Sequence, residues 1–211
     1  MFRDSNLRKR NFDMYDKLFK CINEAFRLLY QNDIHLIYNG PFEDKKIDIN
    51  HHVGERSIVF RFAHYLQNLI IEDDELKEYN LDCEYNRNGA ECKGLPSFPN
   101  GTYPDLIIHK RGSNEHNLLV MEFKTYWNKN RDEDIKKLIE FVDINGEYKY
   151  RYGISVLIEE NRPECLLINP KLIDAVKLYL MGRISMAQGT MIAGVTLEEF
   201  EACLSVLKRE K

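Results

Sequence analysis

The chain has 211 residues, of which 44% are hydrophobic and 30% charged, and its formal net charge is −4. This length suits one α/β domain with helical additions or, at most, two small domains, and the composition excludes a fibrous or disordered chain. No apolar run approaches the roughly 20 residues of a membrane span, and the polar, basic start lacks the apolar segment of a signal peptide. We therefore expect a cytoplasmic protein with no membrane partner.

The five cysteines are scattered and odd in number: Cys21, Cys83, Cys92, Cys165 and Cys203. This distribution argues against a disulfide framework and fits a reducing compartment. A zinc site made by Cys83 and Cys92 with His51 or His52 is the less favoured alternative, because zinc ligands normally come in closely spaced pairs.

The N-terminal part of the chain is predicted to be mainly helical. Apolar residues recur at three- and four-residue steps over residues 11–31, which predicts an amphipathic helix. A short strand is expected over residues 35–38, closed by an Asn-Gly-Pro turn at residues 39–41. A second amphipathic helix is expected over residues 55–71, headed by Glu55.

The middle of the chain is predicted to hold a strand, a loop and a hairpin. Residues 81–87 are strand-like, and residues 88–103 contain three glycines and two prolines, which predicts a long loop. Two apolar runs, residues 106–108 and 118–121, are separated by a polar segment with Arg-Gly-Ser-Asn, which predicts a β-hairpin. Both faces of these runs are apolar, so we expect helices to cover both faces of the sheet.

The last third alternates helix and strand. We expect a helix over residues 132–142, a strand over 150–158, and helices over 170–181 and 196–208. Thr196 and Glu199 have the spacing of a capping box, which sets the start of the last helix. The chain is thus expected to be a single α/β domain over residues 1–211. Its parts are an N-terminal helical extension over 1–50, a core over 51–160 and a C-terminal helical extension over 161–211.

The predicted hairpin brings two acids together. If its turn is centred between Ser113 and Asn114, Asp105 stands directly opposite Glu122, with Cβ atoms roughly 4.5–5.5 Å apart on one face. Lys124 projects from the same face, because strand side chains alternate. Facing carboxylates repel unless a cation lies between them, and Mg²⁺ is commonly held by one or two carboxylates with water and phosphate oxygens. Lys124 can stabilise developing negative charge on a phosphate.

These residues resemble a known pattern. Tyr103-Pro104-Asp105 followed by Glu122-Phe123-Lys124 resembles the PD-(D/E)XK nuclease superfamily, which includes restriction endonucleases, junction resolvases and repair exonucleases. The resemblance covers about residues 50–160. Residues 84–87, 103–112 and 118–124 also resemble a recurring group of stand-alone bacterial and phage proteins in that superfamily.

The resemblance implies a restriction endonuclease-like core, with a central mixed four-stranded sheet flanked by helices, and a metal-dependent nuclease acting on DNA. Asp105, Glu122 and the backbone carbonyl of Phe123 are the implied ligands of Mg²⁺, for which Mn²⁺ can substitute. Lys124 would orient or activate water, and Glu55 would help to place metal or water. Many members act as homodimers, because two strands require two sites, and a homodimer is left open here.

Several candidates have a plainer interpretation. Glu55 could only complement the dipole of its helix, and Arg87, proposed as a phosphate ligand, could form a surface salt bridge. Lys136 or its neighbour Lys137 could approach the substrate or lie on a solvated helix face, and His52 could contact substrate or be a surface loop residue. The alternative function is a catalytically inactive module of the same fold, used for nucleic-acid binding or complex assembly.

Overall fold

The computed structural model of the protein describes residues 5–38 and 52–209, with side chains from residue 14 onward. The predicted turn at residues 39–41 and the zinc candidate His51 lie outside the described residues. Contacts divide the chain into two compact units. The helical unit is Met1–Asn80 with Glu160–Arg162, and the sheet unit is Leu81–Glu159 with Pro163–Lys211.

The helical unit consists of two long helices and two short 3₁₀ turns. Its elements are α1 (Ser5–Asn32), η1 (Ile34–Leu36), α2 (Glu55–Ile70) and η2 (Leu76–Glu78). The apolar stripes of α1 and α2 are buried, and the rings of Phe26 and Phe62 lie 4.3 Å apart between centroids. Both helices agree with the periodicity of the sequence, because burying an apolar stripe is what stabilises an amphipathic helix.

The short strand expected at residues 35–38 is wrong, because this segment forms the 3₁₀ turn η1. The backbone N–H of Leu36 donates to the carbonyl of Asp33 at 2.9 Å, which closes the turn. The carboxylate of Asp33 also accepts hydrogen bonds from Arg61 at 3.1 Å and from the Tyr65 hydroxyl at 2.5 Å. These bonds tie the end of α1 to α2 and favour a turn over an extended conformation.

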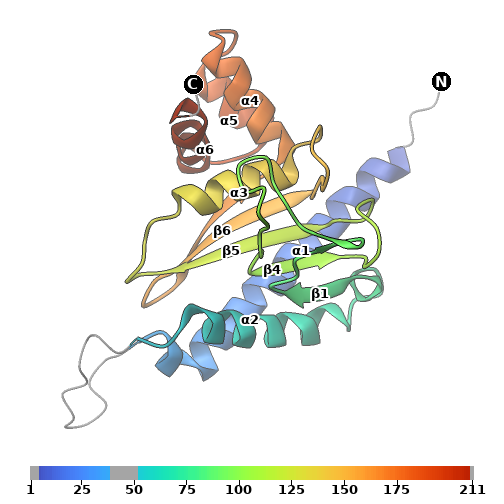
Figure 1. Cartoon of the computed structure of the whole chain (residues 1–211), viewed down its shortest axis with the longest axis vertical. Helices are drawn as coiled ribbons and strands as arrows, with labels where there is room; N and C mark the ends of the chain where they lie inside the picture. Colours follow the sequence, from blue (N-terminus) through green and yellow to red (C-terminus); the bar gives the residue numbers. More distant parts are fainter. Residues whose placement is uncertain (1–4, 39–51, 210–211) are drawn as a thin grey trace. The chain divides into compact units, whose positions relative to one another are not determined.

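The sheet unit contains a mixed five-stranded sheet in the order β1-β4-β5-β6-β7 (Figure 1). The strands are β1 (Asn80–Cys83), β4 (Leu106–His109), β5 (Leu119–Thr125), β6 (Tyr152–Ile158) and β7 (Pro163–Ile168). Strand β5 runs antiparallel to β4 and parallel to β6, and β7 runs antiparallel to β6. Nearly every side chain of β5 is buried, so both faces of this strand are covered, as its apolar sequence predicts.

Two parts of the sheet unit differ from expectation. The sheet has five strands instead of four, because the segment assigned to a helical extension begins with β7; this strand starts at Pro163, where the missing N–H is tolerated. The strand expected up to residue 87 ends at Cys83, because Glu84 has a positive φ of 49°. Within the predicted loop, β2 (Arg87–Asn88) pairs with β3 (Glu91–Cys92) in a small hairpin.

Helix α3 (Asp132–Val142) lies across β5 and β6 (Figure 1). Three further helices pack together beside it: α4 (Pro170–Leu180), α5 (Met186–Ala193) and α6 (Leu197–Arg209). The predicted capping box is confirmed, because Thr196 Oγ1 accepts from the N–H of Glu199 at 3.2 Å and Glu199 Oε2 accepts from the N–H of Thr196 at 2.7 Å. Among the described residues, none of the helices is both long and apolar enough to cross a bilayer.

Candidate active site

The register of the β4–β5 pair places Asp105 next to Glu122. Leu106 pairs with Met121 and Ile108 with Leu119, which is the register expected from the sequence. Asp105 directly precedes β4, and its Oδ2 accepts a hydrogen bond of 2.7 Å from the backbone N–H of Phe123. The Asp105 side chain is therefore fixed against β5 beside the Glu122 position.

Glu122 is a buried acid, and its two carboxylate oxygens differ in their contacts. Its side chain is 2% exposed, and its Oε2 lies 3.5 Å from Lys137 Nζ. Its Oε1 has no hydrogen-bond partner among residues 5–38 and 52–209. Burial, and then the negative charge of Asp105, raise the pKa of Glu122 well above its ordinary value. Burial also raises the pKa of Asp105, although the N–H of Phe123 opposes this.

A second polar atom without a partner lies on the neighbouring strand. Ser155 on β6 is paired in register with Glu122, and its buried Oγ makes no hydrogen bond within the described part of the chain. Directly paired residues of parallel strands project from the same face. Buried polar atoms are almost always satisfied, so these two atoms mark a place where a polar ligand would be favoured.

Lys124 is held by an acid of α3. Its Nζ lies 2.9 Å from Oδ2 of Asp134 and donates to the carbonyl oxygen of Phe123 at 3.3 Å. The Asp134 side chain is only 4% exposed and that of Lys124 is 19% exposed, so this ion pair is partly shielded from water. The Phe123 carbonyl, implied above as a metal ligand, thus accepts from Lys124 in this structure.

Sequence reasoning missed how α3 completes this cluster. Lys137 was named with Lys136 as a residue that could approach the substrate, and Asp134 was not proposed for the site. In the structure Lys137 Nζ lies 3.5 Å from Glu122 and 3.6 Å from Asp134. A usable signal was the three-residue spacing of Asp134 and Lys137, which places both on one side of a helix whose apolar residues face the sheet.

The other predicted site residues lie on other elements of the chain. Arg87 is exposed on the small hairpin. Lys136 lines a surface hollow between α3 and α6, together with Asp132, Glu133, Val206 and Arg209. Glu55 is the half-buried first residue of α2 and His52 precedes it, and both belong to the helical unit. The structure therefore brings together Asp105, Glu122 and Lys124 within the sheet unit.

For the zinc alternative, Cys83 and Cys92 are both exposed free thiols. Within residues 5–38 and 52–209, no three or more histidine, cysteine, aspartate or glutamate residues are grouped so that they could hold a metal ion. A metal ion near Lys124 would therefore have two carboxylate ligands, Asp105 and Glu122, and its remaining ligands would be water and substrate.

A separate polar cluster joins β1 to β4. Asp82 accepts from Arg111 Nε at 2.9 Å and lies 2.9 Å from His109 Nε2. Burial opposes ionisation of Asp82, but the hydrogen bonds from His109 and Arg111 outweigh it and lower the pKa of Asp82 to about 2. The buried His109 ring also packs against Tyr85, at 4.8 Å between centroids. This cluster stabilises the edge of the sheet.

We expect Asp82→Asn to lower the free energy of unfolding by about 2 kcal/mol at pH 7. A carboxylate whose folded-state pKa is depressed stabilises the protein above its ordinary pKa near 3.8, and this contribution is lost as the pH falls through about 2. Urea titrations at pH 7 and pH 3 measure the difference. Asp174→Asn, at an exposed position of α4, is the control and should shift stability by less than about 0.5 kcal/mol. A pH-independent difference would contradict this assignment.

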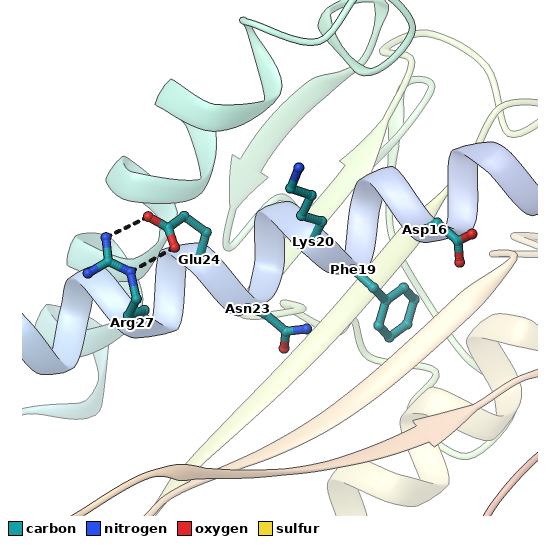
Figure 2. Close-up of a pocket in the computed structure, with 6 residues that line it drawn as sticks. All are labelled: Asp16, Phe19, Lys20, Asn23, Glu24 and Arg27. Carbon is teal, nitrogen blue, oxygen red and sulfur yellow. Dashed lines mark hydrogen bonds and ion pairs between the residues drawn. The ribbon is translucent and has the colours of Figure 1, made fainter.

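The helical unit offers a hollow of another kind, on the surface of α1 (Figure 2). It has a volume of about 550 Å³ and is lined by Asp16, Phe19, Lys20, Asn23, Glu24 and Arg27. Arg27 Nε donates to Glu24 at 2.8 Å, so two of the four charged side chains that line the hollow are paired with each other. An open helix face with a surface ion pair offers no group poised for catalysis.

Comparisons with known proteins add no further evidence about this site: no family model matches the sequence, and no curated protein matches it significantly.

Proposed function

We propose that the chain is a metal-dependent nuclease of the restriction endonuclease-like fold, which hydrolyses phosphodiester bonds in DNA. The observation that carries this proposal is the juxtaposition of Asp105 and the deeply buried Glu122, with Lys124 two residues further along the same strand. Burying two neighbouring acids costs free energy. Such an arrangement is expected where the acids bind a cation for function.

The residues present suit Mg²⁺ in chemistry. Mg²⁺ prefers oxygen ligands and usually takes one or two carboxylates, completing its shell with water and substrate phosphate. The unpartnered Oε1 of Glu122 is such a ligand, and Asp105 would supply the second. When bound, the metal would polarise the scissile phosphate and lower the pKa of an attacking water.

Lys124 would stabilise charge on the substrate, and the other residues would position the metal ion and the phosphate. Lys124, held by Asp134, would stabilise the negative charge that develops on the phosphate in the transition state. Asp105 and Glu122 would hold the cation and orient it toward the phosphate. The roles expected for Glu55, in placing metal or water, and for the exposed Arg87, in binding phosphate, stay predictions. The five free cysteines support a cytoplasmic location.

We expect wild-type protein with Mg²⁺ or Mn²⁺ to cleave DNA, and Lys124→Ala to lower the cleavage rate by about 10²-fold while DNA binding is retained. The assay compares products from single-stranded, duplex, nicked and branched DNA, with RNA of the same sequence alongside. The same panel shows whether cleavage is internal or from an end. Binding is measured separately with Ca²⁺ in place of Mg²⁺.

The alternative is a catalytically inactive module that binds nucleic acid or assembles complexes. The ion pairs of Lys124 with Asp134 and of Lys137 with Glu122 favour it, because they neutralise part of the cluster without a metal. Pure wild-type protein that binds DNA but cleaves none of these substrates would support the alternative and contradict the nuclease.

A further inference from the structure

Lys137 occupies a particular place in the charged cluster. It reaches from α3 toward β5, and its Nζ lies 3.5 Å from Oε2 of Glu122 and 3.6 Å from Oδ1 of Asp134. These distances are within ion-pair range but longer than the 2.9 Å that joins Lys124 to Asp134. Lys137 is therefore the looser of the two lysines in contact with the acids.

The surroundings of Lys137 allow it to move. Its side chain is 20% exposed, and its Nζ lies 5.8 Å from the centre of the Phe98 ring. A lysine has a flexible stem and a strongly hydrated head, so the ammonium group of Lys137 can turn from the acids toward water. Glu122, with 2% of its side chain exposed, cannot reach water in this way.

The charges of the cluster explain why such a lysine is needed. Three acids, Asp105, Glu122 and Asp134, face two lysines, and Lys137 is a cation within ion-pair distance of Glu122. Leaving a buried carboxylate without a counter-ion is strongly destabilising. A divalent cation bound to the same carboxylate would make that counter-ion unnecessary and would repel it.

We propose that Lys137 is a built-in counter-cation of Glu122 and that it exchanges with the divalent cation at this carboxylate. This inference rests on the proposed function, because that proposal places a divalent cation at Glu122. The inference adds that Lys137 and the cation compete for the Glu122 carboxylate. Once released, the ammonium group of Lys137 would be available to a phosphate oxygen of the substrate. Metal binding and exposure of a phosphate-binding cation would then be a single linked event.

The test is the affinity of the whole protein for Mn²⁺ without nucleic acid, measured by calorimetry and by the loss of the free-ion electron paramagnetic resonance signal. Lys137→Met keeps the length of the side chain and removes its charge, so we expect Mn²⁺ to bind about tenfold more tightly than to wild type. Lys137→Arg keeps the charge and should bind Mn²⁺ like wild type. Lys136→Met, on the same helix but lining the hollow beside α6, is the matched control and should leave Mn²⁺ affinity unchanged.

The double variant Glu122→Gln with Lys137→Met locates the effect, because the gain in affinity should disappear when Glu122 no longer carries a charge. Equal or weaker Mn²⁺ binding by Lys137→Met, with a normal circular dichroism spectrum, overturns the exchange. Absence of Mn²⁺ binding in both wild type and Lys137→Met overturns it as well.

The nuclease proposal fails by a different measurement, namely absence of cleavage. A gain in Mn²⁺ affinity in Lys137→Met supports the exchange even in a protein that cleaves nothing.

Discussion

Replacing Glu122 with glutamine is expected to lower the rate of Mg²⁺-dependent cleavage by about 10³-fold and, in the same protein, to raise the melting temperature measured without metal. The two effects have one cause. The buried carboxylate is needed to bind the metal ion, and in the metal-free protein its negative charge is costly even beside Lys137. Glutamine has nearly the same shape and carries no charge.

The stabilisation should depend on pH in a definite direction. The folded-state pKa of Glu122 is raised above the ordinary value of 4.5, so the folded protein takes up a proton more readily than the unfolded chain. Wild type therefore loses stability as the pH rises from about 4.5 toward the folded-state pKa. The advantage of Glu122→Gln should be absent at pH 4 and present at pH 8, where a rise of about 2–6 °C is expected.

The matched control for this prediction is Glu115→Gln, an exposed glutamate in the turn between β4 and β5. It should change neither cleavage nor melting temperature. Thermal unfolding in EDTA at the two pH values, followed by cleavage assays on the same preparations, completes the experiment. A Glu122→Gln protein that is less stable than wild type at pH 8 would show that Glu122 serves packing or hydrogen bonding instead.

Truncating Phe200 to alanine is expected to lower the free energy of unfolding by about 3–5 kcal/mol. The Phe200 side chain is completely buried where α4, α5 and α6 meet. Its ring packs edge-on against Tyr179, with 5.8 Å between centroids, and so closely against Gly189 that a Cβ there would lie 2.5 Å from the ring. Neighbours this tightly packed cannot fill the space that alanine would leave.

Leu197→Ala is the control for Phe200→Ala, because Leu197 lies on the same helix and 53% of it is exposed. Its loss should change stability by less than about 0.5 kcal/mol. Urea unfolding of both variants, monitored by circular dichroism, measures the difference. Similar losses for the two variants would mean that the α4–α6 cluster contributes little to the stability of the whole chain.

The sequence predicted well those features that depend on local patterns. The helix over residues 132–142 coincides with α3, because its apolar spacing and the acids of its first turn both act within one helix. The hairpin register was also predicted, from a turn centred between Ser113 and Asn114, although the connection over residues 110–118 is longer than a tight turn. The Thr196–Glu199 capping box follows from a four-residue motif.

Features that depend on distant partners were not predictable in the same way. Strand β7 forms because β6 offers a free edge, and its own residues alternate only weakly between buried and exposed. Helix α5 is short, and Met191 and Ile192 are exposed on it, so its apolar pattern does not mark a buried stripe. Tertiary packing decides such elements.

In the candidate site, too, some features follow from local sequence patterns and others depend on distant partners. Asp105, Glu122 and Lys124 follow from strand register, which is a nearly local property. The contacts of Asp134 and Lys137 with them depend on how α3 lies on the sheet, which no spacing along β5 reveals. The sequence pattern therefore identified Asp105, Glu122 and Lys124 but not the contacts that α3 makes with them.

The parallel pairing of β5 with β6 has a consequence for how the chain folds. Parallel neighbours require a crossover, and α3 is that crossover. Glu122, Lys124, Asp134 and Lys137 therefore all fall within residues 122–137, and bringing them together closes only a short loop. Contacts between residues close in the chain form rapidly, so the charged cluster can assemble early, before β7 and the C-terminal helices have docked.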